Sequence, residues 1–295
     1  MPPSSQQHDH TVTFPNGATV PALGMGTWAM GDAPAKRPQE IAALRYGLEH
    51  GLHVIDTAEM YGNGRSETLV GEAIAPFARD RVFLVSKVLP SHAAHDDVLK
   101  ACRQSLARLG TDHLDLYLLH WRSSVPLAET VGAFEALMAD GLIRSWGVSN
   151  FDVDDMEELA AVPGAQAANG VQANQILYAL EYRGTEWDLL EADRAQGVVT
   201  MAYSPLGQAK RILTSPALKA IAAKHHTSLG PATPAQIALA WVLRQPGVLA
   251  IPKAGTVAHE RENIAALEIT LSAADLLALD RAFPPPLRKR PLACI

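Results

Sequence analysis

The chain has 295 residues, of which 48% are hydrophobic and 19% are charged, and this composition excludes extensive disorder. The 25 Lys and Arg residues against 31 Asp and Glu give a net charge of −6, which lacks the basic character of a nucleic-acid-binding protein. No apolar run reaches the roughly 18 residues that cross a membrane, residues 1–10 do not resemble a signal peptide, and two cysteines cannot build a disulfide framework. We therefore expect a cytoplasmic protein without a membrane or nucleic-acid partner.

The predicted elements begin with a flexible arm over residues 1–10, followed by a β-hairpin over 11–20. Pro15-Asn16-Gly17 stands at the centre of this hairpin, and Asn-Gly is a strong hairpin signal. Eight short apolar runs predict strands over 22–25, 52–55, 82–86, 114–119, 145–148, 171–173, 198–202 and 248–251. Amphipathic segments predict helices over 38–50, 66–77, 96–109, 128–140, 153–161, 186–196, 234–245, 259–266 and 272–282.

Eight strands that are each followed by a helix are typical of a (β/α)8 barrel of the α/β class. A doubly wound open sheet shows the same alternation with about six strands, so the count favours the barrel. No composition shift or linker divides the chain, which predicts a single domain over residues 11–295. We expect the hairpin to plug the N-terminal mouth, and the tail that begins at Pro284-Pro285-Pro286 to form a C-terminal loop over the other mouth.

Polar side chains stand at or just beyond the C-terminal ends of seven predicted strands. In a (β/α)8 barrel these ends surround one mouth, where the active site is built. Each residue alone has an ordinary structural explanation, such as a helix cap or a rim charge, but seven at one mouth indicate a functional site. The residues are Asp56, Lys87, His120, Ser149-Asn150, Gln175, Tyr203-Ser204 and Lys253.

Asp56, Tyr61, Lys87 and His120 form a chemically coherent set near this mouth. A phenol with an ordinary pKa near 10 is a poor proton donor at neutral pH, and an adjacent ammonium group lowers that pKa. We expect Asp56 to keep Lys87 charged, Lys87 to tune Tyr61, and His120 to donate a hydrogen bond to a carbonyl oxygen. Such a set would protonate an alkoxide as it forms, and that chemistry requires a hydride source.

Longer motifs surround these residues in a fixed order. The first is Gly51-Leu52-His53-Val54-Ile55-Asp56-Thr57-Ala58-Glu59-Met60-Tyr61-Gly62. The later ones are Val85-Ser86-Lys87, Leu118-Leu119-His120-Trp121, Gly147-Val148-Ser149-Asn150-Phe151, Asn174-Gln175, Ala202-Tyr203-Ser204-Pro205-Leu206 and Ile251-Pro252-Lys253. Over about residues 12–283 the ordered set resembles the aldo-keto reductase family, most closely its bacterial methylglyoxal-reducing members.

The resemblance implies that NADPH binds in an extended form across the barrel mouth and that small carbonyl compounds are the substrates. Tyr61 would be the general acid in the reduction of aldehydes and 2-oxoaldehydes such as methylglyoxal, with ketones as further candidates. The implied cofactor contacts are Gly26 and Thr27 near the nicotinamide; Ser149, Asn150 and Gln175 on its carboxamide; Tyr203 on its ring; Ser204 and Leu206 along the pyrophosphate; Lys253, Thr256 and His259 at the 2′-phosphate; and Glu262 and Asn263 at the adenine. The implied frame of the substrate pocket is Trp28, Met60, Trp121 and the tail from Phe283.

The chain departs from the better-known family pattern at the implied 2′-phosphate site. That pattern has Ser directly after the lysine and Arg six positions after it, whereas this chain has Ala254 and His259 after Lys253. A guanidinium group is the best fork for a phosphate, so its loss predicts a weaker preference for NADPH over NADH than is usual.

Two other functions are also consistent with the sequence: a slow-turnover, NADPH-sensing regulatory barrel, and a non-redox barrel isomerase or lyase. The segment 24–29 fits a dinucleotide fingerprint, but no helix start follows its glycines. The segment 259–263 is close to a zinc motif but lacks the second histidine, so we expect no metal. Nothing indicates an obligate interface, and we expect a monomer.

Overall fold

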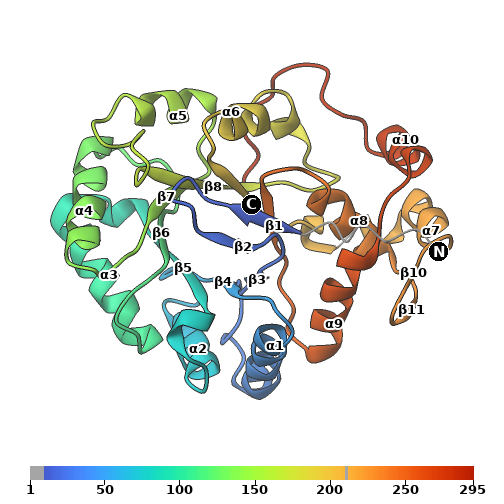
Figure 1. Ribbon diagram of the computed structural model, residues 1–295, viewed down its shortest axis with the longest axis horizontal. Helices are drawn as coiled ribbons and strands as arrows, with labels where there is room; N and C mark the ends of the chain where they lie inside the picture. Colours follow the sequence, from blue (N-terminus) through green and yellow to red (C-terminus); the bar gives the residue numbers. More distant parts are fainter. Residues whose placement is uncertain (1–9, 210–211) are drawn as a thin grey trace, which may run out of the picture.

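Eight parallel strands form a closed barrel within residues 10–209 and 212–295, the part of the chain that the computed structural model describes (Figure 1). Bridges from Leu23 to Ala250 and from Gly26 to Lys253 join the first barrel strand to the last. The strands follow one another around the barrel in chain order: β3 (Met25–Gly26), β4 (Val54–Asp56), β5 (Phe83–Val88), β6 (Leu116–Leu119), β7 (Trp146–Ser149), β8 (Val171–Leu177), β9 (Val199–Tyr203) and β12 (Val248–Ile251). The predicted (β/α)8 barrel is confirmed.

The predicted helices are all present, within a few residues of their expected bounds. They are α1 (Arg37–Glu49), α2 (Arg65–Ile74), α3 (His95–Leu109), α4 (Leu127–Ala139), α5 (Val153–Ala160), α6 (Leu189–Ala195), α8 (Pro234–Leu243), α9 (Val257–Ala265) and α10 (Ala273–Ala282). Because α1 packs against both α2 and α9, the helical ring around the barrel closes where the barrel does.

Helix α3 shows how the sequence directs these helices onto the barrel. Val98, Cys102, Leu106 and Leu109 recur at intervals of three or four residues and are all buried on the same side. Gly110 then adopts a left-handed conformation, with φ of 65°, which ends the helix at a residue that pays no steric penalty there.

Two short elements were not expected from the sequence. Helix α7 (Pro216–Ala222) and the small hairpin of β10 (His226–Thr227) and β11 (Gly230–Pro231) lie outside the barrel, and α7 packs against α8. With this cover in place, every residue of α8 from Gln236 to Leu243 is buried. None of the helices in the described part of the chain is long and apolar enough to cross a membrane.

The N-terminal hairpin closes the end of the barrel at which the strands begin. Its strands are β1 (Thr11–Thr13) and β2 (Thr19–Pro21). In its turn, Phe14 stacks on Phe83 with ring centroids 5.2 Å apart, and the Asn16 N–H donates to Gln172 Oε1 at 2.8 Å. Since Phe83 and Gln172 stand at the starts of their strands, the hairpin plugs the N-terminal mouth as predicted. The predicted flexible arm falls, apart from its last residue, outside the described residues.

The tail after α10 runs past α6 toward the middle of the barrel (Figure 1), and its contacts place it at the opposite mouth. Lys289 Nζ forms ion pairs with Asp152, directly before α5, and with Asp188, directly before α6. Farther along, Cys294 Sγ donates to Asn150 Oδ1 at 3.4 Å, just beyond the end of β7. The predicted C-terminal loop over the mouth is therefore present.

Candidate active site

Lys87 lies at the centre of a buried polar cluster inside the C-terminal mouth. Its Nζ donates to Asp56 Oδ2 at 2.8 Å, to the Thr57 backbone oxygen at 2.9 Å and to Tyr61 Oη at 3.0 Å. All three ammonium hydrogens therefore have an acceptor, and the opposite charge of Asp56 offsets the cost of burying the cation.

The strand register brings these side chains together. Asp56 pairs with Val85 on the neighbouring strand, and Lys87 is two residues farther along β5. Because side chains alternate along a strand, Lys87 and Val85 point to the same side, the barrel interior. Tyr61 lies in the loop between β4 and α2, where its N–H donates to the Ala58 oxygen in a tight turn.

The electrostatics of Tyr61 differ from the expectation that Lys87 lowers its pKa below the ordinary value. Burial raises the pKa of Tyr61 and outweighs the opposing effect of the Lys87 charge, so the net shift is upward. Burial by itself lowers the pKa of Lys87, but the attraction of Asp56 and Tyr61 and the hydrogen bonds to both together outweigh it, and the pKa is raised. Lys87 therefore stays charged and Tyr61 stays protonated, which is the state that a proton donor needs.

His120 completes the cluster from the end of β6. Burial, assisted by the Lys87 charge, lowers the pKa of His120 to about 3, so the imidazole is neutral at physiological pH. Its ring stands edge-on to that of Tyr61, with centroids 5.9 Å apart, and Nδ1 has no hydrogen-bond partner among the described residues. A neutral imidazole beside the phenol can donate one N–H to a carbonyl oxygen.

The three residues expected at the nicotinamide carboxamide meet at the ends of β7 and β8. Ser149 pairs with Gln175 in the strand register, and its Oγ donates to the Gln175 backbone oxygen at 2.8 Å. Asn150 Nδ2 donates to Ser149 Oγ at 3.2 Å, while Tyr203 Oη donates to Asn150 Oδ1 at 2.9 Å. Cys294 shares this last acceptor, so the tail reaches the same group.

Left-handed backbone at non-glycine residues is concentrated in the mouth. In the described part of the chain five such residues have positive φ, and each lies in a loop that follows a barrel strand. They are Ala29, Asn63, Asn150, Ser204 and Gln208. Such conformations cost of order 1–3 kcal/mol each and persist where the surroundings fix them, commonly at functional sites. Two of the five, Asn150 and Ser204, are expected cofactor contacts.

Gly26 and Thr27, two expected cofactor contacts, also stabilise the structure of the mouth. A Cβ atom at Gly26 would lie 2.6 Å from the Ile251 carbonyl oxygen, so only glycine permits the contact that closes the barrel. The Thr27 hydroxyl donates to the Asp56 backbone oxygen at 2.9 Å and is fully buried. Thr27 thus helps to fix the backbone position of Asp56.

The expected 2′-phosphate site is more exposed to solvent than the cluster around Lys87. Lys253 follows β12 and is exposed, and its side chain has no partner among the described residues. Thr256 caps α9, with its Oγ1 accepting from the His259 N–H at 3.2 Å, and the His259 ring is exposed. Of the two expected adenine contacts, Glu262 is half-buried and Asn263 is buried. Within the described residues, no group of three or more His, Cys, Asp or Glu could hold a metal ion.

The aromatic residues expected at the substrate pocket are not core residues. Trp28 is 54% exposed and meets the Tyr61 ring edge-on at 5.0 Å, while Trp121 is 39% exposed and lies 4.9 Å from the His120 ring. Met60 is half-buried beside Tyr61. The two indoles therefore flank the phenol and the imidazole at the surface of the mouth.

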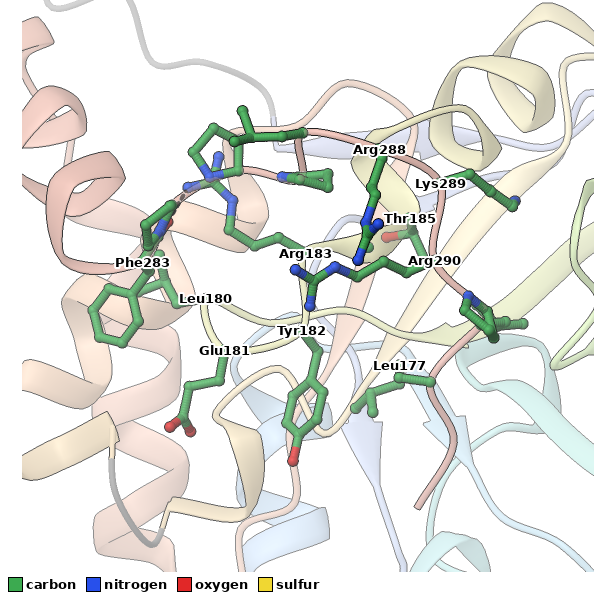
Figure 2. A pocket seen from close by; sticks show the side chains of 18 of the residues that line it. Leu177, Leu180, Glu181, Tyr182, Arg183, Thr185, Phe283, Arg288, Lys289 and Arg290 are labelled. Carbon is green, nitrogen blue, oxygen red and sulfur yellow. Dashed lines mark hydrogen bonds between the residues drawn. The ribbon is translucent and has the colours of Figure 1, made fainter.

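The tail and the segment that follows β8 line a cavity of about 940 Å3 (Figure 2). Its walls carry the basic side chains of Arg183, Arg288, Lys289 and Arg290. Arg183 is neutralised by Glu186 and Asp280. Sequence reasoning missed this cavity because it depends on the path of an irregular tail.

Glu59 is a second residue that sequence reasoning did not assign. It is buried, and its Oε1 accepts from the Leu89 N–H at 2.7 Å and contacts His92 Nδ1 at 2.9 Å. Glu59 thereby ties the loop that carries Tyr61 to the loop after β5. Its position inside the Asp56–Tyr61 motif was the available signal.

Comparison with known proteins places this geometry in a family. The model of the Aldo/keto reductase family matches residues 22–283. Methylglyoxal reductase YeaE of Escherichia coli is 49% identical over 285 residues, covering 95% of this chain and 97% of the relative. Crystal structures of a Klebsiella pneumoniae aldo-keto reductase with NADP and acetate, and with NADPH, are each 49% identical with a TM-score of 0.91; they cover 97% of this chain and 100% and 99% of theirs. The chain belongs to the aldo/keto reductase family.

Proposed function

We propose that this protein is an NADPH-dependent reductase of aldehydes and 2-oxoaldehydes, including methylglyoxal, in which Tyr61 donates the proton. The observation that carries this proposal is the 3.0 Å hydrogen bond from Lys87 Nζ to Tyr61 Oη, with Asp56 on the other side of the ammonium group. The names of the relatives support it: one is a methylglyoxal reductase, and the solved structures contain NADP or NADPH.

Each residue of the cluster has a distinct task. His120, held neutral by burial, donates an N–H to the carbonyl oxygen and fixes it beside the phenol. Tyr61 passes its proton to the same oxygen as charge develops there. Lys87, held by Asp56 and the Thr57 carbonyl, stabilises the phenolate that remains. Bound NADPH would supply the hydride to the carbonyl carbon.

The groups at the mouth fit the two ends of this cofactor. At one end Gln175 Oε1, the Asn150 amide and the Ser149 hydroxyl would face a carboxamide, although Asn150 Oδ1 must first release Cys294 or Tyr203. At the other end Lys253, a cation without a partner in the described residues, stands beside the N-terminus of α9, and such helix ends favour phosphate.

Replacement of the phenol tests the role of Tyr61. Tyr61→Phe keeps the ring and removes the proton, so we expect kcat for methylglyoxal to fall by about 10²- to 10⁴-fold. NADPH affinity, measured by quenching of tryptophan fluorescence, should change little. A variant with near-normal kcat would show that another group is the acid. Tight NADPH binding by the wild-type protein without turnover on a panel of aldehydes, sugars and 2-oxoaldehydes would favour the regulatory barrel.

We further infer that residues 11–295 act as one cytoplasmic, monomeric domain. The closed barrel and the tail that returns to its mouth support the single domain. Two cysteines that make no disulfide, Cys102 in α3 and Cys294 in the tail, agree with a reducing compartment. Size-exclusion chromatography with light scattering tests the monomer, and a mass twice that of the chain would refute it.

A further inference from the structure

Gln175 connects the nicotinamide end of the site to the proton donor. Its side chain is buried, at 1% exposure, and Nε2 donates to Asp56 Oδ1 at 2.7 Å across the barrel interior. The other oxygen of Asp56 accepts from Lys87, which in turn donates to Tyr61. The four side chains therefore form one continuous series of hydrogen bonds, drawn from β8, β4, β5 and the loop after β4.

The other end of the Gln175 amide is unused. Oε1 makes no hydrogen bond with any described residue. It is also not one of the fully buried polar atoms that lack a partner, so it is not completely closed off from solvent. Its neighbours Ser149 and Asn150 are the groups expected around the nicotinamide carboxamide. One amide thus offers an acceptor toward the cofactor site and has its donor fixed on Asp56.

We propose that Gln175 is a positioning residue that transmits occupancy of the nicotinamide site to Tyr61 through Asp56 and Lys87. A carboxamide N–H that donates to Oε1 polarises the amide and strengthens its Nε2–H as a donor, since hydrogen bonds in series reinforce one another. The stronger donor draws negative charge on Asp56 away from Lys87. More of the ammonium field then acts on the Tyr61 oxygen, and the proton leaves more readily. This role rests on Tyr61 being the proton donor of the proposed function.

The surroundings of Tyr61 allow this effect to be isolated. The charged groups that act on its phenol are Lys87 and Asp56, Tyr203 is the further titratable group coupled to it, and His120 faces its ring as a neutral imidazole. Gln175 contacts Asp56 and not Tyr61 itself. Among the described residues, the hydrogen-bonded route from the Gln175 side chain to the phenol therefore runs through the Asp56–Lys87 pair.

The test is the pH dependence of kcat for carbonyl reduction at saturating NADPH. Activity falls at high pH as Tyr61 loses its proton, and the midpoint of that fall gives its apparent pKa. Gln175→Met has a side chain of similar length without a donor, so the midpoint should move upward by about half to one pH unit. Ser149→Ala is the matched control, because it removes another expected nicotinamide contact that does not touch Asp56. It should weaken NADPH binding and leave the midpoint in place.

Gln175→Glu provides a conservative rescue. A carboxyl group that faces Asp56 at this distance must keep its proton, because two like charges cannot both be ionised there. In that protonated state it again donates to Asp56. The Glu variant should follow the wild-type profile at low pH and approach the Met variant at high pH, and it carries the test if the Met variant does not fold in a thermal melt.

The outcomes separate the two proposals. An unmoved midpoint in both Gln175 variants, with weaker NADPH binding alone, would overturn the coupling and leave Gln175 as a cofactor contact. Retained activity in Tyr61→Phe would instead overturn the proposed function, because the midpoint would then belong to another group. A shifted midpoint in the Met variant, rescue by the Glu variant and an unshifted Ser149→Ala control support the coupling.

Discussion

The two ends of the expected cofactor site are built differently. At the nicotinamide end Lys87 uses all three of its donors and Asp56 uses both of its oxygens, and both residues are buried. At the adenosine end Lys253 and His259 are exposed, and within the described residues neither side chain has a partner. The groups proposed to perform the chemistry are thus positioned before any ligand arrives, as electrostatic catalysis requires. The groups that would hold the phosphate are left to solvent, where charges contribute little individually.

The largest effect should come from a substitution that disrupts the preorganised nicotinamide end of the site. Lys87→Met leaves Asp56 as an uncompensated buried charge, which typically costs about 3–5 kcal/mol of stability. It also removes the field that stabilises the Tyr61 phenolate, so we expect kcat to fall by about 10³-fold or more. Urea unfolding and steady-state kinetics measure the two losses. A Lys87→Met variant that loses activity without losing stability would show that Asp56 finds another partner.

A smaller effect, on the stability of the fold, is expected from a buried residue of α9. Glu260 is fully buried there and neither carboxylate oxygen has a partner among the described residues. Burial raises the pKa of Glu260 to about 8, and the nearby Asn263 amide, which forms no hydrogen bond of normal geometry with the carboxylate, opposes the shift only in part. The folded protein therefore keeps a proton that the unfolded chain releases above pH 4.5, so stability is lost as the pH rises from about 4.5 to about 8.

Glu260→Gln removes this titration. We expect the variant to be more stable than wild type by about 1–3 kcal/mol at pH 8.5, and little changed near pH 4.5. Urea unfolding at both pH values measures the difference. Asp193, whose pKa burial raises to about 7, contributes a slope of the same sign that remains in the variant. Equal stabilities of the variant and the wild type at pH 8.5 would contradict this role of Glu260.

A substitution at the open, adenosine end of the cofactor site should have a modest effect that is selective for NADPH. Lys253→Met is expected to weaken NADPH binding about tenfold, because one exposed ammonium–phosphate contact is lost. NADH, which lacks the 2′-phosphate, should bind as before, and the salt dependence of NADPH binding should decrease. Lys219→Met, at an exposed position of α7, is the control. Equal weakening of NADH would place Lys253 elsewhere on the cofactor.

The smallest expected change is an increase in the preference for NADPH over NADH. His259→Arg introduces a guanidinium fork at the first turn of α9, six positions after Lys253, and should raise the ratio of kcat/KM for NADPH over NADH by about three- to tenfold. Steady-state kinetics with both cofactors check this ratio. If the wild-type protein already shows strong discrimination that the variant does not improve, then Lys253 and the helix N-terminus suffice for phosphate recognition.

Local patterns predict most of the fold and the contents of the site. Strand–helix alternation gives the barrel, and because all parallel strands end at one mouth, Asp56, Lys87 and His120 are placed together without knowledge of their distances. Helix α7 and the β10–β11 hairpin escape such reasoning because segments of seven and two residues carry too little periodicity.

What depends on contacts across the molecule could not be predicted from the sequence. The bond from Gln175 to Asp56 joins residues 119 positions apart, and its existence depends on how the barrel closes. The upward shift in the pKa of Tyr61 depends on how deeply the phenol is buried, and the charge of Lys87 alone gives the opposite sign. The path of the tail depends on the ion pairs of Lys289.

The N-terminal hairpin and the C-terminal tail have opposite consequences for anyone who handles this protein. A fusion or purification tag placed before the hairpin joins the end of the barrel that the hairpin seals, far from the reacting groups. One placed after Ile295 begins next to Cys294 on Asn150, at the expected nicotinamide site. The position of a tag is therefore an experimental variable, and kinetic constants from a C-terminally tagged preparation would describe the tag as well as the enzyme.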